Sequence, residues 1–116
     1  MTETELEKQL KIAYGILFKR YNNIAQVNKD KLGKAGYKIL FMGITCISNP
    51  EKFTAEKMSR WLGFVQGILW QNGFLDIDEE RNFSRPILHR VYKDLKVQPP
   101  ESIDIQEELV NNWGES

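Results

Sequence analysis

The chain has 116 residues, 41% of them apolar and 28% charged, a composition typical of one globular domain. This balance excludes an intrinsically disordered chain, and the single cysteine excludes an internal disulfide framework. No apolar run is long enough to span a membrane, and no secretory signal pattern follows Met1. We therefore expect a cytoplasmic protein.

The net charge of zero conceals an uneven distribution along the chain. Residues 101–116 hold five acidic and no basic residues, so the rest carries 16 basic and 11 acidic ones, a net charge of +5. The densest basic stretch holds Lys29, Lys31, Lys34 and Lys38. The acidic tail can fold back on the basic body, each can meet a different partner, or the charges can simply solvate helix faces.

The first predicted helix spans about residues 3–27. Thr2 and Glu5 have the spacing of a capping box, which satisfies free N–H groups at a helix start. Apolar residues then recur at steps of three and four, namely Leu6, Leu10, Ala13, Ile16 or Leu17, Tyr21 and Ile24. The Asn residues at positions 22, 23 and 28 predict its end or an interruption.

The second segment, residues 30–48, permits two interpretations. One helical face is formed by Leu32, Ala35, Ile39, Met42 and Cys46. Residues 37–48 also contain the β-branched and aromatic residues of a strand. A lone strand would leave its backbone groups unsatisfied, and the chain offers no second strand. We therefore predict a helix that ends before Pro50.

The third predicted helix runs from a cap at Thr54 to about residue 72, with Gly73 as its stop. Its broad apolar face predicts a central place in the core or at an oligomer interface, and contains Met58, Trp61, Leu62, Val65, Ile68 and Leu69. Gly63 and Gly67 share a face, and each costs about 1 kcal/mol relative to alanine in a helix. We expect them to allow close packing of another helix.

The fourth predicted helix starts at Asp76 or Asp78 and continues to about Leu95, with Pro86 expected to kink or restart it. The prediction is thus an all-α fold, a small four-helix bundle-like domain over residues 1–98 with a kinked fourth helix. The acidic tail, residues 99–116, can add a short amphipathic turn anchored by Ile103, Ile105, Leu109, Val110 and Trp113.

The sequence contains no pattern that identifies a reaction, a metal or a cofactor. The only histidine, His89, has no partnered Cys or Ser motif, and one His with one Cys forms no zinc spacing. The acids between positions 76 and 80 lack the ligand spacing of an EF-hand and are explained as helix caps. Cys46 has no basic neighbour in sequence to activate it. We expect a protein that is not an enzyme.

Aromatic residues suggest a binding interface instead. Phe64 and Trp70 flank the main face of the third helix, and Trp113 lies in the tail. Such residues dominate protein interfaces, although all of them can also fit inside a compact core. The predicted interface comprises Trp61, Phe64, Gln66, Trp70 and Trp113, and a helical domain this small is a candidate homo-oligomer.

The segment Arg60-Trp61-Leu62-Gly63-Phe64-Val65-Gln66-Gly67, with the acidic turn 76–80, Arg81 and Arg85-Pro86, resembles small uncharacterised proteins of tailed bacteriophages and prophages. The resemblance covers about thirty residues and implies no catalytic residue. It implies a phage accessory protein in the cytoplasm of a bacterial host cell.

Three functions remain open. The leading hypothesis is a non-enzymatic accessory protein that binds a host or phage macromolecule, in particular a protein, and counters host defence. The second is a binder of a nucleotide signal, whose phosphates would meet Arg81, Arg85, His89 and Lys93 at a subunit interface. The third is weak nucleic-acid binding through the lysine-rich second segment. We expect no membrane partner.

Overall fold

The structure is a computed structural model that describes residues 3–98. Its described residues are helical, without a strand, which confirms the all-α prediction and settles residues 37–48 as helix. Contacts divide the chain into two units, residues 1–75 and residues 76–116, and each unit is described by itself. The single domain predicted over residues 1–98 stays a prediction.

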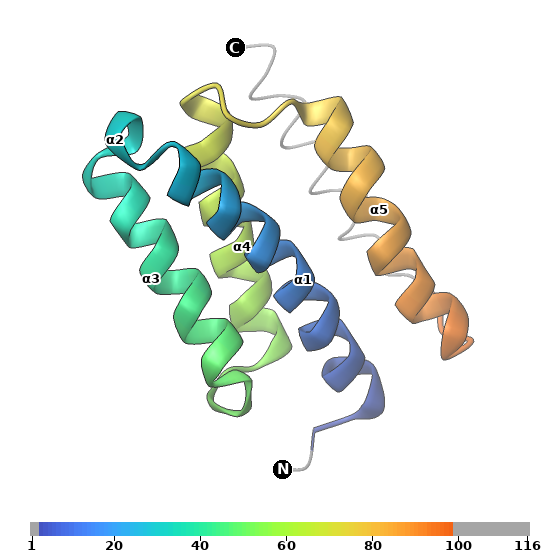
Figure 1. Ribbon diagram of the computed structural model, residues 1–116. Helices are drawn as coiled ribbons and strands as arrows, with labels where there is room; N and C mark the ends of the chain where they lie inside the picture. Colours follow the sequence, from blue (N-terminus) through green and yellow to red (C-terminus); the bar gives the residue numbers. More distant parts are fainter. Residues whose placement is uncertain (1–2, 99–116) are drawn as a thin grey trace. The chain divides into compact units, whose positions relative to one another are not determined.

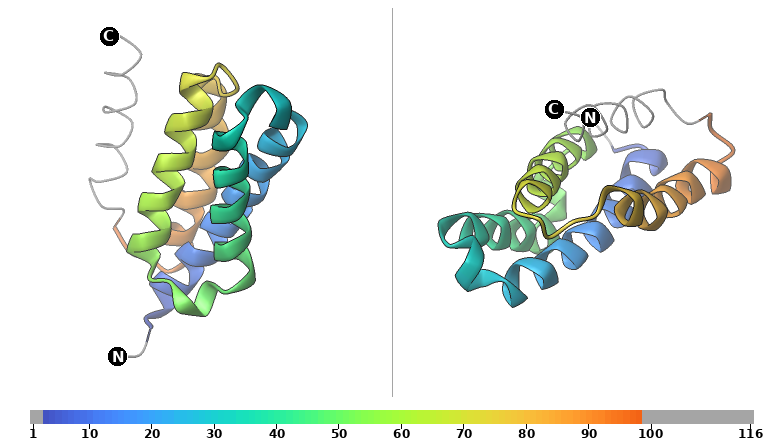
Figure 2. Two further views of the ribbon diagram at one scale, coloured as in Figure 1. Left: turned by 90° about the vertical axis from the view of Figure 1, so that its left-hand side faces the viewer. Right: turned by 90° about the horizontal axis from the view of Figure 1, so that it is seen from above.

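The first unit is built around three long helices, α1 (Glu5–Val27), α3 (Lys34–Ser48) and α4 (Ala55–Gln71). The short α2 (Lys29–Leu32) joins α1 to α3, and a 3-10 turn, η1 (Pro50–Lys52), joins α3 to α4. Helix α1 packs against both α3 and α4. Successive long helices run in opposite directions, and the two views of Figure 2 show them side by side, as Figure 1 does.

The core of this unit comes from one face of each long helix. Its fully covered side chains, each below 2% exposed, include Leu17, Phe18 and Tyr21 from α1, Ile39 and Cys46 from α3, and Met58, Val65 and Leu69 from α4. These positions follow the helical spacing of the apolar residues in each segment. The predicted apolar faces of all three helices are therefore confirmed.

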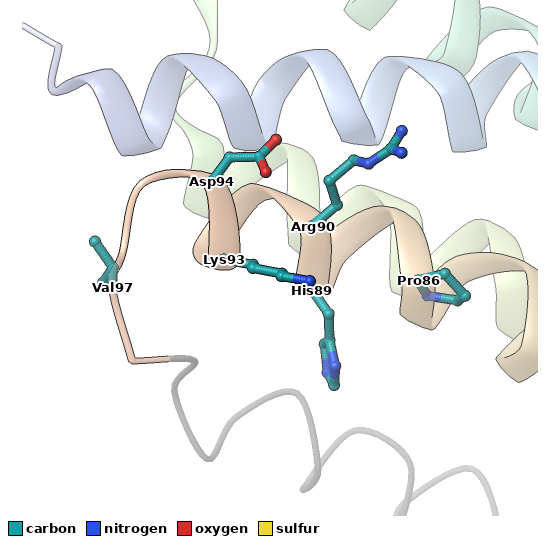
Figure 3. Close-up of a pocket in the computed structure, with 6 residues that line it drawn as sticks. All are labelled: Pro86, His89, Arg90, Lys93, Asp94 and Val97. Carbon is teal, nitrogen blue, oxygen red and sulfur yellow. The ribbon is translucent and has the colours of Figure 1, made fainter.

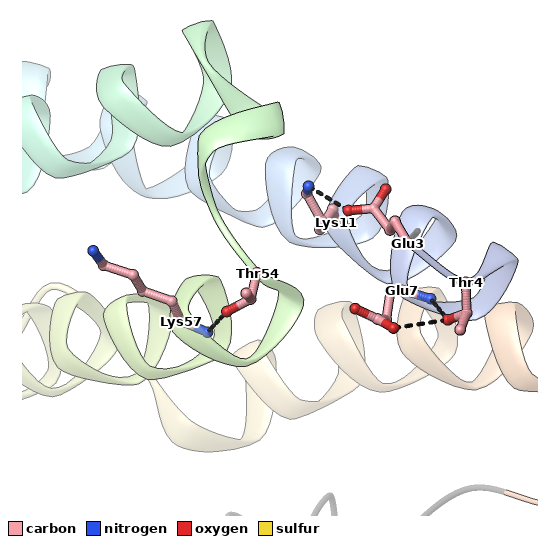
Figure 4. A network of polar contacts seen from close by, with 6 residues as sticks. All are labelled: Glu3, Thr4, Glu7, Lys11, Thr54 and Lys57. Carbon is pink, nitrogen blue, oxygen red and sulfur yellow. Dashed lines mark hydrogen bonds and ion pairs between the residues drawn. The ribbon is translucent and has the colours of Figure 1, made fainter. Parts of the chain in front are cut away.

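Local capping sets where these helices begin. The Thr54 hydroxyl accepts a hydrogen bond from the Lys57 N–H at 3.1 Å, which confirms the predicted cap of α4. Helix α1 begins two residues later than predicted. Its N-cap is Thr4, whose hydroxyl accepts a hydrogen bond from the Glu7 N–H (Figure 4). Thr2 itself lies outside the described residues.

One residue splits the second predicted helix. Gly33 adopts φ +60°, a backbone conformation that residues other than glycine rarely adopt. It separates α2 from α3. At the end of α4, Gly73 adopts φ +80°, with hydrogen bonds from its own N–H to Trp70 and from the Phe74 N–H to Leu69. This pair forms a Schellman motif, so the predicted stop at Gly73 is confirmed.

The described part of the second unit is helix α5 (Ile77–Asp94) and the four residues after it. Asp76 is its N-cap and accepts from the Glu79 N–H at 3.0 Å. The helix continues through Pro86, so the predicted restart does not occur. Beyond Asp94 the chain turns through Lys96, whose φ is +56°.

Candidate binding surfaces

Helix α3 carries apolar side chains on two opposite sides. Ile39, Met42 and Cys46 face the core, as predicted from their spacing. Tyr37, Phe41 and Ile44 follow each other at steps of four and three, so they share the opposite side of the helix. These three side chains are 62%, 67% and 56% exposed, respectively. Three aligned and largely exposed side chains of this size form an apolar stripe on the protein surface.

Lysine residues border this stripe. Lys34 and Lys38 are exposed and lie on α3 beside Tyr37 and Phe41, and Lys31 is exposed on α2. The Lys38 ammonium lies 5.2 Å from the ring centre of Phe64 on α4, within cation–π range. We call the surface formed by Lys34, Tyr37, Lys38, Phe41, Ile44 and Phe64 the α3 face. Because α3 contains no acidic residue, this face is both apolar and positively charged.

Sequence reasoning did not identify the α3 stripe as a surface. The sequence analysis predicts one core-facing apolar stripe on this helix. Residues 37–47 contain two apolar stripes, which lie about half a turn apart around the helix. The signal was the spacing of Tyr37, Phe41 and Ile44, which share a face opposite to that of Ile39 and Cys46. A helix that is apolar on both sides leaves one side exposed unless a second element or a partner covers it.

The residues predicted at an interface occupy different places. Trp61 is half-buried and packs edge-to-face on Phe53, with ring centres 5.1 Å apart, and the Lys57 ammonium lies over both rings. Trp70 is half-buried on the same helix. Phe64 alone among the predicted residues within 3–98 is classed as exposed, and it joins the α3 face. Trp113 lies outside the described residues.

Gln66 links two helices of the core instead of facing outward. Its side-chain N–H donates to the hydroxyl of Tyr21 on α1 at 2.6 Å, and the Tyr21 side chain is fully buried. This hydrogen bond joins α4 to α1 beside the apolar core. The Gln66 side chain thus acts within the fold, and its expected place at an interface stays a prediction.

The expected close approach at Gly63 is not seen among the described residues. A methyl group added there would meet no described atom within 4 Å, and the residue is exposed. Gly67 is half-buried. A close helix approach does occur at Gly43 on α3, where an added Cβ would collide with the side-chain amide of Asn22 on α1.

The basic residues predicted on the fourth helix are only partly brought together. Helix α5 runs from Arg81 to Lys93 without a break, so the predicted steps of four place these residues along one side. An open depression of about 620 Å³ is lined by Pro86, His89, Arg90, Lys93, Asp94 and Val97. His89 and Lys93 thus share this depression, whereas Arg81 and Arg85 are not among those lining residues.

The geometry of this depression does not converge on one ligand atom. In Figure 3 the imidazole of His89 and the guanidinium of Arg90 point in opposite directions, and the Arg90 guanidinium also extends away from the Asp94 carboxylate. Arg90 and Asp94 belong to the depression, although the predicted row did not include them. The open surface carries the cations Arg90 and Lys93 and the anion Asp94, without an enclosed pocket.

Metal-binding groups and the single cysteine were the remaining candidates for reactive chemistry. No group of three or more His, Cys, Asp or Glu side chains within residues 3–98 is arranged to bind a metal ion. Burial raises the pKa of the Cys46 thiol to about 11, against a smaller opposing effect of Lys57. A thiol of that pKa is protonated at neutral pH and is a poor nucleophile.

Comparisons with known proteins add no functional assignment. No protein-family model, curated protein or solved structure matches this chain. Between residues 3 and 98, none of the helices has the combination of length and apolar character that crossing a membrane requires. The candidate surfaces are therefore judged by their own chemistry.

Proposed function

We propose that this chain is a non-enzymatic binding protein of the phage accessory type, and that it engages a host or phage protein through the α3 face. The observation that carries the proposal is the exposure of Tyr37, Phe41 and Ile44 in one line along α3. Exposed aromatic anchors with charged neighbours are the usual centre of a protein interface. The resemblance of residues 60–89 to phage proteins supports the biological setting, the bacterial cytoplasm, and a role against host defence.

The chemistry of the α3 face defines the kind of partner. Lys34 and Lys38 attract a negatively charged surface, and the stripe beside them requires apolar side chains at helical spacing. The partner segment is therefore an amphipathic helix with acidic residues beside its apolar side. This requirement favours a protein partner over nucleic acid, because phosphates would leave the apolar stripe uncovered.

A capture experiment tests this function. The full chain, immobilised, is exposed to bacterial lysate, and each captured protein is then purified and its Kd for the chain is measured. Phe41→Asp places a carboxylate in the middle of the stripe and should weaken binding at least tenfold. Ile12→Asp is the matched control, because Ile12 on α1 is 55% exposed and lies outside the α3 face. Equal affinities of the two variants would rule out the α3 face as the binding surface.

Self-association is the related proposal, with α3 faces of two copies in contact. It predicts a dimer or larger species for the natural chain in light scattering and a monomer for Phe41→Asp. A strictly monomeric natural chain at high concentration would exclude it. The partner proposal would still stand, because it needs only one copy of the α3 face.

Nucleotide binding is the second candidate, supported by the shared depression of His89 and Lys93. A nucleotide at a hundred times its Kd should raise the free energy of unfolding by about 2.7 kcal/mol. A thermal-shift screen with cyclic and linear nucleotides detects such an increase, and Lys93→Glu should abolish it. The absence of a shift with every nucleotide tested would remove this candidate.

A further inference from the structure

The end of helix α4 contains a pair of residues that can react with each other. Asn72-Gly73 is the only Asn-Gly pair in the sequence, and both residues are exposed. The backbone nitrogen that follows an asparagine can attack the side-chain amide of that asparagine. Glycine hinders this attack least, because it has no side chain and its backbone bends most freely. The pair is therefore a candidate site of spontaneous modification.

The conformation of Asn72 holds the two reacting atoms apart. The attack requires the Gly73 nitrogen to lie beside the Cβ of Asn72 around the Cα–C bond. At the observed ψ of 4° this nitrogen lies almost in line with the backbone nitrogen of Asn72, about a third of a turn from Cβ around a tetrahedral carbon. The side-chain amide also donates to the Ile68 carbonyl at 2.8 Å, which directs the Asn72 side chain back along α4. The reaction therefore requires both groups to rotate.

Two backbone hydrogen bonds oppose that rotation. The Gly73 N–H donates to the Trp70 carbonyl at 3.0 Å, and the Phe74 N–H donates to the Leu69 carbonyl at 2.9 Å. We call these two bonds, with that of the Asn72 side chain, the α4 cap. Rotation of the Asn72 backbone moves both N–H groups away from their carbonyls. The reactive geometry is therefore reached only when the α4 cap opens.

We propose that Asn72 is a deamidation site whose reaction is controlled by opening of the α4 cap. In the open form the Gly73 nitrogen forms a bond to Cγ of Asn72, and the bond between Cγ and the side-chain nitrogen breaks. Ammonia leaves with the proton that the Gly73 nitrogen loses, and a five-membered succinimide ring remains. Water then adds to one of the two ring carbonyls and opens the ring. The product is an aspartate or an isoaspartate at position 72, and no oxidation or reduction takes place.

Neither product can rebuild the α4 cap. A carboxylate has no N–H to donate to Ile68, and its charge lies at the carboxyl end of α4, where the helix dipole is also negative. Isoaspartate adds one carbon atom to the backbone, so the N–H groups of Gly73 and Phe74 no longer match the carbonyls that they bind. The modification is therefore one-way and leaves the end of α4 more open. It goes beyond the proposed function, because no residue of the α4 cap belongs to the α3 face.

Mass spectrometry of the full chain measures this reaction during incubation in mildly alkaline buffer. Peptide mapping places the change at residue 72, and fragmentation distinguishes aspartate from isoaspartate. A synthetic peptide of residues 66–78 serves as the unfolded reference. We expect the folded chain to react at least about tenfold more slowly than the peptide, in proportion to the fraction of molecules in which the cap is open. In concentrated urea the chain should react as fast as the peptide.

Two variants at position 74 test the α4 cap itself. Phe74→Pro removes the N–H that donates to Leu69, and it should speed the reaction of the folded chain several-fold. Phe74→Ala keeps this N–H and is the matched control for loss of the ring. Each rate is divided by that of a peptide with the same substitution, and circular dichroism verifies that both variants are folded. If Phe74→Pro does not fold, the comparison of the natural chain with its peptide decides.

Three results would contradict the proposal. Equal rates for the folded chain and the peptide would show that the α4 cap gives no protection. No deamidation at residue 72 in urea would show that the pair is not reactive. Equal rates for folded Phe74→Pro and Phe74→Ala would assign the protection to another part of the molecule. The capture experiment is independent of all three, because it depends on Phe41 and not on Asn72.

Discussion

Gly43 on α3 lies directly against the side chain of Asn22 on α1. A Cβ added at Gly43 would collide with the amide group of Asn22. The side-chain oxygen of Asn22 is buried there and accepts no hydrogen bond within the part of the chain that the structure describes. The absence of a side chain at Gly43 leaves room for this amide. The contact therefore makes the residue tolerated at position 43 depend on the residue at position 22.

Gly43→Ala should destabilise the fold by about 1–2 kcal/mol, because the cost of overpacking exceeds the helix preference of alanine. In the Asn22→Ala background the same change should be neutral or stabilising by up to about 1 kcal/mol, since the obstructing amide is gone. Urea unfolding of the four chains gives the coupling energy. Equal effects of Gly43→Ala in both backgrounds would contradict the contact.

Gly63→Ala should have the opposite sign to Gly43→Ala. The added methyl group meets no described atom within 4 Å, and alanine is favoured over glycine in a helix by about 1 kcal/mol. Thermal unfolding should show a higher midpoint for this variant. Gly15→Ala on α1 is a useful parallel, because a Cβ there is also unobstructed. A lower midpoint for Gly63→Ala would indicate a neighbour at this face.

The hydrogen bond between Gln66 and Tyr21 should contribute about 1 kcal/mol to folding. Gln66→Ala and Tyr21→Phe should each destabilise the protein, and their combination should cost less than the two separate losses added together. Denaturant unfolding of the double-mutant cycle measures this coupling. Strictly additive losses would show that the two side chains act independently.

Two helix ends of the same geometry differ in the residue that adopts positive φ. Gly73 does so after α4 and Lys96 after α5, where the Val97 N–H donates to the Tyr92 carbonyl. Because only glycine adopts this conformation without strain, Gly73→Ala should destabilise and Lys96→Gly should stabilise, each by about 1 kcal/mol. Calorimetry on both variants checks the pair, and Lys96→Ala serves as a control, because it removes the lysine but keeps a Cβ at the positive φ.

Cys46 should lower the stability of the protein in alkaline solution. Its pKa rises from 9.0 to about 11 in the folded state, chiefly through burial. The unfolded chain therefore loses the thiol proton first, and stability is lost as the pH rises from about 9 to 11. The free energy of unfolding should fall less steeply over this range in Cys46→Ala. Identical slopes for the two proteins would contradict the raised pKa.

Sequence analysis could predict features that depend on a few neighbouring residues. Thr54, Gly73 and Asp76 occupy their predicted caps, because each satisfies free backbone groups within its own turn. The start of α1 was placed wrongly, since Thr2 and Thr4 both precede a glutamate by three residues. Both positions fit the same motif, so only the structure distinguishes them.

Relations between helices were harder to predict. The spacing of Gly63 and Gly67 suggested a packing site, yet Gly43, without a partner glycine at that spacing, provides the close approach. Gln66 is predicted at an interface, and its side chain donates a hydrogen bond to Tyr21. The burial of Gln66 depends on which face of α4 is covered by α1. The spacing of apolar residues in the sequence reveals each apolar stripe. Which stripe is buried depends on how the helices pack, and the spacing does not determine this.

The two-sided character of α3 also has a consequence for the unfolded chain. Residues 39–48 contain no charge and no proline, and they hold Phe41 and four β-branched residues, namely Ile39, Ile44, Thr45 and Ile47. Such a window forms intermolecular β-structure when its backbone is released from a helix. Lys38 stands at its start, and Asn49-Pro50 follows its end, residue types that oppose this pairing. Aggregation from partly unfolded molecules should therefore begin in α3, and these flanking residues set its rate.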